Sequence, residues 1–123
     1  MNNETLIKTI QDIWFLKDEI TMLVEEYNEF EAAKVEYDSL TNHPYGEFLT
    51  SRIQYLSRDV AYAELIIDRL QDERYKTILR MRHMQRETVE SIAASIGYSP
   101  AYIHNLYKKA LQAVVLEHER LQL

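Results

Sequence analysis

Residues that break helices are almost absent from this chain, and they stand in only two places. The 123 residues include two glycines and two prolines, and these form the close pairs Pro44 with Gly46 and Gly97 with Pro100. Because glycine and proline interrupt helices most strongly, long helices are predicted on either side of the two pairs. No run of residues shows the period-two alternation of a strand. The sequence therefore predicts an all-α fold.

A long first helix is predicted from about residue 4 to residue 40. Its apolar residues recur at spacings of three, four and seven, which place them on one stripe: Leu6, Ile10, Ile13, Ile20, Val24 and Tyr27. Five bulky residues widen this stripe: Trp14, Phe15, Leu16, Leu23 and Phe30. A stripe of this width is expected to pack on another helix, in the same chain or in a partner.

Residues 41–46, with the sequence Thr-Asn-His-Pro-Tyr-Gly, form the clearest turn in the chain. A second helix is predicted over residues 47–70, so residues 1–70 should form a coiled-coil-like helical hairpin. Such a hairpin leaves apolar surface exposed, and we expect two chains to form a homodimer through these N-terminal helices. The alternative is a monomer in which the C-terminal domain, residues 71–123, covers that surface.

Charge is distributed unevenly along the chain. The net charge is −6, but residues 1–50 carry three lysines against eleven acidic residues, whereas residues 74–112 carry seven basic residues against two acidic ones. This asymmetry favours an acidic arm joined to a module that can meet phosphates, with the arm projecting away from nucleic acid. The simpler alternative is that two solvated faces of the protein carry charges of opposite sign without any functional reason.

Residues 87–111 carry a pattern of helix caps. Thr88 can cap a short helix, and Gly97 follows its last apolar position, as a helix C-cap with positive φ requires. Ser99 is a favourable N-cap, and Pro100 suits the first position of a new helix. The apolar positions expected to face inward in these two helices are Val89, Ile92, Ala93, Ile96, Ile103, Leu106 and Ala110.

This order of short helix, glycine turn, serine cap and second helix is typical of a helix-turn-helix. A further helix over residues 74–83 should add Ile78 and Leu79 to the same core. This helix either begins at residues 71–73 or continues without a break from the helix over residues 47–70. A helix-turn-helix inserts the N-terminal part of its second helix in the major groove. We therefore predict a sequence-specific transcriptional regulator that binds double-stranded DNA.

Two groups of side chains are candidates for DNA contacts. Those expected to face base edges are Ala101, Tyr102, His104 and Asn105, of which the Asn105 amide suits adenine. Those expected to bind phosphates are Arg82, Arg86, Lys108 and Lys109. Ser99 and Pro100 begin the helix, whose first N–H groups can meet another phosphate.

Each of these assignments has a plainer alternative. Tyr102 can pack on a neighbouring helix, and for Tyr107 packing is the favoured interpretation because it adjoins the apolar stripe of its helix. Asn105 can be an ordinary surface residue, and Lys108 and Lys109 can serve only to solvate the helix.

The run LRMRHMQRETVESIAASIGYSPAYIHNLYKKAL, residues 79–111, resembles region 4 of sigma-70 factors. It is more closely similar to small phage and prophage regulators of the ArpU and RinA type. The positions that match their pattern are Arg82–His83, Glu90–Ala93, Ile96–Ser99, Tyr107 and Ala110–Leu111. His83 stands where an aromatic residue is usual, and Ser95–Ile96 replaces a leucine-rich ending. The resemblance implies control of phage or prophage late genes in the cytoplasm of a bacterial host, and RNA polymerase as a possible partner.

Catalytic and metal-binding patterns are missing from the sequence. The chain has no cysteine, and its four histidines, which include His118 between two glutamates, form no zinc-binding pair. His118 is expected to be solvated. The two glycines are too far apart for a phosphate-binding loop of an enzyme. We therefore expect no enzyme activity, no cofactor and no metal, and the apolar runs are too short for a membrane span.

Two other functions compete with transcription regulation. One is a DNA-packaging protein like the small subunit of phage terminases, which also joins a helix-turn-helix to an oligomerising helical segment. The other is a helical protein-interaction module that does not bind DNA. A ring of many subunits favours packaging, and the absence of salt-dependent DNA binding favours the interaction module.

Overall fold

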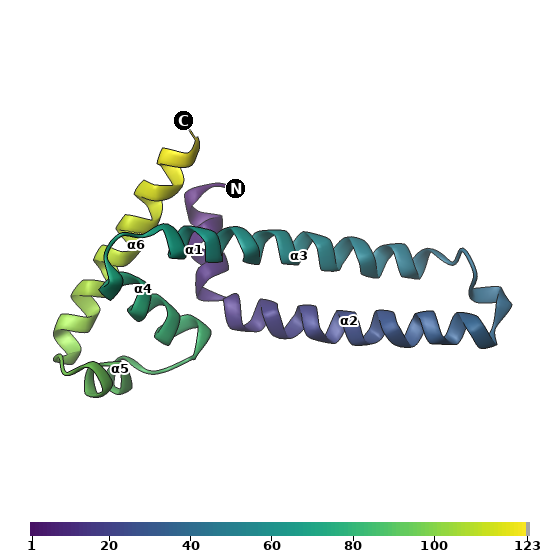
Figure 1. The fold of residues 1–123 in the computed structure, drawn as a ribbon, viewed down its shortest axis with the longest axis horizontal. Coiled ribbons are helices and arrows are strands. Elements are labelled where there is room, and N and C mark those ends of the chain that lie inside the picture. Colours follow the sequence, from purple (N-terminus) through teal and green to yellow (C-terminus); the bar gives the residue numbers. More distant parts are fainter. Residues whose placement is uncertain (123) are drawn as a thin grey trace.

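The computed structural model describes residues 1–122, which form six α-helices with no strand among them (Figure 1). The helices are α1 (Asn3–Gln11), α2 (Ile13–Glu36), α3 (Pro44–Arg69), α4 (Glu73–Leu79), α5 (Val89–Ile96) and α6 (Pro100–Gln122). A short 3-10 helix η1 (Asp38–Leu40) follows α2, and a π-helical turn η2 (Arg80–Met84) extends α4. The predicted all-α fold is confirmed. Every helix in this part of the chain is too short or too polar to cross a bilayer.

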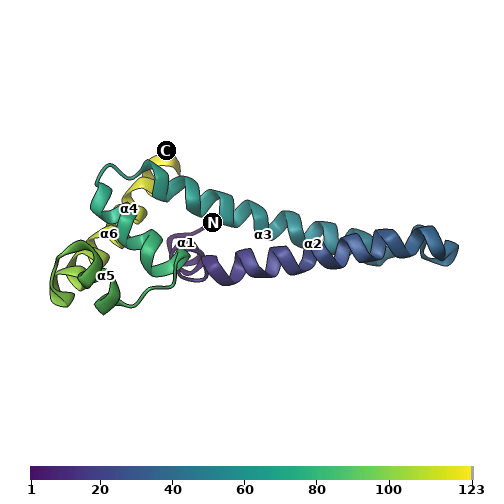
Figure 2. The same ribbon diagram turned by 60° about the horizontal axis from the view of Figure 1, so that its bottom comes forward.

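Helices α2 and α3 run antiparallel and extend away from the other helices, as Figures 1 and 2 show. The predicted turn lies between them, with Asn42 in the left-handed region at φ 67° and Pro44 in the first turn of α3. Gly46 is buried against Phe30 of α2, and a Cβ built on it would lie 3.0 Å from that ring. The absence of a side chain at Gly46 therefore sets how closely the two helices approach at this end.

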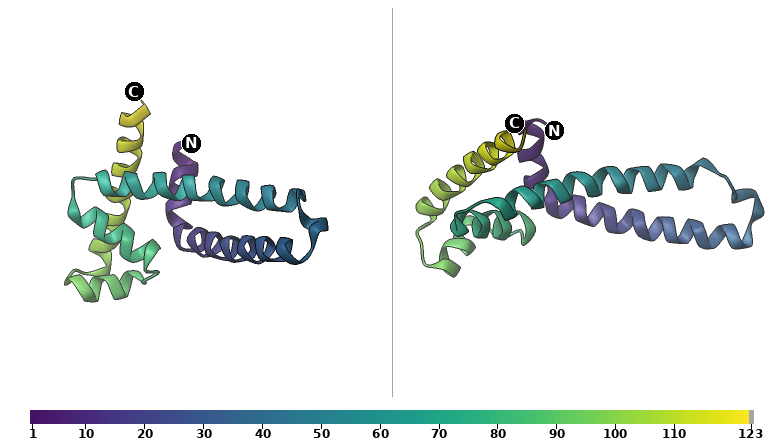
Figure 3. Two further views of the ribbon diagram at one scale, coloured as in Figure 1. Left: turned by 45° about the vertical axis from the view of Figure 1, so that its right-hand side comes forward. Right: turned by 45° about the horizontal axis from the view of Figure 1, so that its top comes forward.

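The prediction of one helix from residue 4 to residue 40 is wrong. The chain kinks at Asp12, and α1 crosses the base of the hairpin while α2 runs along it (Figure 3). The physical reason is tertiary packing. Ile10 of α1 is fully buried in one hydrophobic cluster with Ile66 of α3 and Val114 of α6, which a helix continuing straight along the hairpin would not reach.

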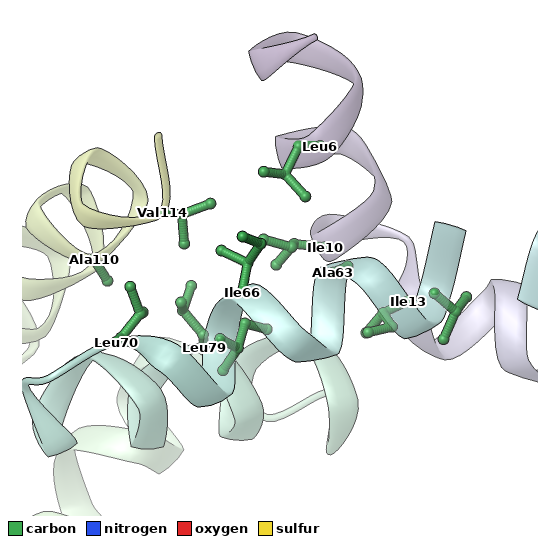
Figure 4. Close-up of a cluster of buried hydrophobic side chains, with 11 residues drawn as sticks. Leu6, Ile10, Ile13, Ala63, Ile66, Leu70, Leu79, Ala110 and Val114 are labelled. Carbon is green, nitrogen blue, oxygen red and sulfur yellow. The ribbon is translucent and has the colours of Figure 1, made fainter. Parts of the chain in front are cut away.

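This hydrophobic cluster joins the two ends of the sequence (Figure 4). Its buried members are Leu6, Ile10, Ile13, Val60, Ala63, Ile66, Ile67, Leu70, Leu79, Ala110 and Val114. The predicted domain boundary after residue 70 falls inside the cluster, since Leu70 and Leu79 both belong to it. A second cluster lies within α4, α5 and α6 and contains Ile78, Ile92, Ala93, Ile103 and Leu106. The hairpin is therefore anchored to the C-terminal helices through shared packing.

The environment predicted for His118 is also wrong. It was expected to be solvated, but only 3% of its surface is exposed. Its Nδ1 lies 2.6 Å from the Tyr62 hydroxyl and its Nε2 lies 2.8 Å from the Met1 carbonyl oxygen. The first residues of the chain and the C-terminal part of α6 therefore lie side by side (Figure 3), and Asn3 donates a hydrogen bond to Glu119 as well.

Candidate nucleic-acid interface

The cap residues around α5 and α6 have the conformations that the sequence predicts. The Thr88 hydroxyl accepts a hydrogen bond from the Ser91 amide at 3.1 Å, which caps α5. Gly97 has φ 79° and ψ 27°, so the turn uses the left-handed conformation that glycine adopts without strain. The Ser99 hydroxyl accepts from the Tyr102 amide at 3.2 Å, directly before α6 begins at Pro100. Local chemistry thus fixes the geometry of the short helix, the turn and the second helix.

Helix α6 has two distinct faces. Its inner face buries Ile103, Leu106 and Ala110 against α4 and α5. Five of the predicted site residues lie exposed on its outer face: Ala101, His104, Asn105, Lys108 and Lys109. Among residues 1–122, none of the polar side chains on this face has a hydrogen-bond partner or an ion pair. The outer face of α6 therefore offers unused donors and acceptors to a ligand.

Tyr102 lies at the side of this face and has partners within the protein. Its hydroxyl accepts a hydrogen bond from Arg74 at 2.8 Å, and its ring packs on Tyr98 with centroids 4.6 Å apart. Arg74 also donates hydrogen bonds to the Asp72 carboxylate. The hydrogen bonds and charge of Asp72 raise the pKa of Arg74, and those of Arg74 lower the pKa of Asp72. Of the two roles that the sequence leaves open for Tyr102, its surroundings favour packing.

Tyr107 connects α6 to the π-helical turn. It is half-buried between the two hydrophobic clusters, and its hydroxyl lies 2.7 Å from Nε2 of His83. Burial, and to a lesser extent the charge of Arg82, lowers the pKa of His83 to about 4. His83 is therefore uncharged at neutral pH and adds no positive charge to this surface. The contact agrees with the packing role that the sequence favours for Tyr107.

The basic side chains divide into two classes. Nine of the fourteen form ion pairs with carboxylates, among them Arg74 with Asp72, Lys76 with Glu73, and Arg80 with Asp68. Within residues 1–122, the basic residues without such a partner are Arg58, Arg82, Arg86, Lys108 and Lys109. The last four are those predicted to bind phosphates. The excess positive charge of residues 74–112 is therefore concentrated on fewer side chains than the sequence suggests.

Arg86 occupies an unusual position. Its φ of 57° is in the left-handed region, which costs a residue other than glycine about 1–2 kcal/mol. Its guanidinium stacks 4.4 Å from the ring centroid of Trp14 and 4.8 Å from that of Phe15. Cation–π contacts at exposed sites contribute about 0.5–1 kcal/mol each, so the stacking offsets much of the backbone strain. The sequence placed the two aromatic residues only on the hydrophobic stripe, and nothing in it indicated their contact with Arg86.

The remaining predicted phosphate contact, Arg82, lies in η2 and donates one hydrogen bond, to the Glu87 carbonyl oxygen at 3.2 Å. Arg82 and His83 line a groove that continues to His104 on α6. The structure thus brings Arg82 close to the outer face of α6.

No cluster of three or more His, Cys, Asp or Glu side chains that could hold a metal ion occurs among the described residues. No protein-family model matches the sequence, and the comparisons with curated proteins and with solved structures also found no match, so the resemblance to phage regulators stays a prediction.

Proposed function

We propose that this protein is a sequence-specific DNA-binding regulator of transcription that places the first turns of α6 in the major groove. The observation that supports this proposal most strongly is the distribution of free positive charge. Four of the five basic residues without a carboxylate partner, Arg82, Arg86, Lys108 and Lys109, lie on α6 or on the segment that precedes α5. The fifth, Arg58, lies on the hairpin.

A basic residue without a carboxylate partner is suited to phosphate. A cation that already has an ion pair must give up that partner, whereas a free cation only exchanges solvent and counterions for the phosphate. Asn105 lies on the same exposed face of α6 as Lys108 and Lys109, and its amide is unbonded within the described chain. An amide can make two hydrogen bonds to adenine in the major groove. The phosphate contacts supply affinity, and Asn105 supplies selectivity.

The replacement Lys108→Ala tests this distribution of charge. We expect the slope of log K against log salt to fall by about 0.9, the value for one phosphate contact on duplex DNA. Fluorescence anisotropy of a labelled duplex at a series of KCl concentrations measures the slope. Arg58→Ala is the matched control, because it removes one unpaired positive charge from α3 and should leave the slope unchanged. Equal effects of the two replacements would show that only net charge matters.

We also propose that the hairpin pairs with a second copy of the chain, as a palindromic DNA site requires. Phe48 and Tyr55 support this proposal, since they stand seven residues apart on α3 and are 61% and 58% exposed. Light scattering is expected to give twice the chain mass of 14.6 kDa, and a Phe48→Lys, Tyr55→Lys variant should be monomeric. A wild-type monomer would contradict the pairing, and a ring of many subunits would favour the packaging protein.

A further inference from the structure

A small cavity lies where the end of α1, the start of α2 and the π-helical turn meet. It has a volume of about 300 Å³ and is lined by Gln11, Phe15, Arg82, His83 and Arg86. We refer to it as the arginine notch. Its lining comes from residues separated by about seventy positions in the sequence, and they meet because of the kink between α1 and α2.

The notch contains one arginine, Arg86, that contacts two aromatic rings and keeps its hydrogen-bond donors free. The cation–π contacts with Trp14 and Phe15 hold the Arg86 guanidinium close to both rings, and within residues 1–122 that group donates no hydrogen bond. Arg82, on the other side, uses one of its five N–H donors for a carbonyl oxygen. Two guanidinium groups with unused donors in one small cavity are the arrangement that recognises a phosphate oxyanion.

The acidic groups near the notch do not occupy it. Asp12 follows α1, and its carboxylate is bound by Lys8 at 3.0 Å. Glu87 accepts a hydrogen bond from the Ser91 hydroxyl at 3.1 Å, and its second carboxylate oxygen is buried without a partner. Neither residue lines the cavity. The charge of Asp12 reaches His83 at the edge of the notch, where it raises the pKa of His83 against the larger effect of burial. The charged side chains that line the cavity itself are the two arginines.

We propose that the arginine notch is a binding site for a phosphate group, with Trp14 and Phe15 acting as positioning residues for Arg86. The assignment of this phosphate to a DNA backbone rests on the proposed function. The geometry supports this source because Arg82 and His83 also line the groove that reaches His104 on α6. The N-terminal helices then take part in the DNA interface, as well as in the pairing of two chains.

Trp14 is the only tryptophan in the chain, so its fluorescence reports on the notch directly. We expect a saturable change of Trp14 emission on titration with inorganic phosphate, and no such change with chloride at the same ionic strength. Arg86→Asn should abolish the response, because asparagine tolerates the left-handed backbone but removes the guanidinium. Lys108→Ala should keep the phosphate response while it weakens duplex binding.

Positioning by Phe15 is tested separately. Phe15 is 56% exposed, so Phe15→Ala should leave the fold intact, which far-UV circular dichroism checks. In Phe15→Ala the slope of log K against log salt for duplex binding should fall by about 1, which corresponds to the loss of one phosphate contact. Phe15→Tyr keeps an aromatic ring beside Arg86 and should have the slope of the original protein. If Phe15 has only a structural role, Phe15→Ala should lower the free energy of unfolding and leave the salt slope of duplex binding unchanged.

The two proposals fail in different ways. A phosphate response of Trp14 without binding to any duplex would support an anion site in the notch and would overturn the DNA-binding function. Duplex binding with no change of Trp14 emission, and with an unaltered salt slope in Arg86→Asn, would overturn the notch and leave DNA binding in place. No response to either phosphate or duplex would overturn both.

Discussion

Replacing Ile10 by alanine is expected to lower the free energy of unfolding of the molecule by about 2–5 kcal/mol. The Ile10 side chain is fully buried and belongs to the cluster that contains Ile66 and Val114. Removing three carbons there leaves a cavity between α1, α3 and α6, and a core that includes both chain ends relaxes only in part. The effect is a large fraction of the stability of a typical domain, which is about 5–15 kcal/mol.

Urea unfolding measured by far-UV circular dichroism and by Trp14 fluorescence tests this expectation. Val35→Ala is the control, since Val35 is 89% exposed on α2 and its replacement should change stability by less than about 0.5 kcal/mol. Both signals should shift together in Ile10→Ala, because α1 and the C-terminal helices share one core. If only the fluorescence transition moved, the region around Trp14 at the start of α2 would unfold separately, and the packing of α1 would not stabilise α6.

The helices and caps around the proposed DNA surface could be predicted because their causes are local. Thr88 and Ser99 each accept a hydrogen bond from an amide three residues later, and Gly97 ends α5 in the left-handed conformation that glycine adopts without strain. These interactions depend on near neighbours in the sequence.

The kink at Asp12 could not be predicted, because its cause is distant in the sequence. The apolar spacing continues from Ile10 and Ile13 to Ile20, so the pattern of an unbroken helix is preserved across the kink. Packing on Val114, about a hundred residues away, decides the direction of α1. His118 was missed for the same reason, since a histidine between two glutamates gives no sign of a buried partner such as Tyr62.

The candidate site was predictable in part. The pairing of Lys76 with Glu73 follows from their spacing on one helix, so the sequence alone could have shown that the charge of Lys76 is not free for phosphate. The pairing of Arg80 with Asp68 joins two helical segments, so it could not have been predicted from the spacing of residues on one helix. Stacking of Arg86 on Trp14 depends on both the kink and a left-handed residue, so the arginine notch is visible only in three dimensions.

Asn105→Ala is expected to weaken binding to the preferred duplex by about 1–3 kcal/mol, or roughly fivefold to 150-fold. Asn105 is exposed and unbonded within the described chain, so the replacement costs little folding energy. Its loss removes selectivity for one base pair and leaves every phosphate contact in place. Affinity for unrelated duplexes and the salt slope should therefore stay the same.

Selection from a randomised duplex pool identifies the preferred sequence, and anisotropy with its single-base variants then measures selectivity at each position. In Asn105→Ala, discrimination should disappear at one base pair and persist elsewhere. Lys108→Ala gives the opposite pattern, with weaker binding to all duplexes and unaltered discrimination. An equal loss on every duplex in Asn105→Ala would mean that Asn105 does not read a base, because a residue that contacts only the backbone cannot distinguish one sequence from another. If the selection also yields no preferred sequence, binding depends on DNA shape and charge alone, which fits a packaging protein better than a regulator of chosen genes.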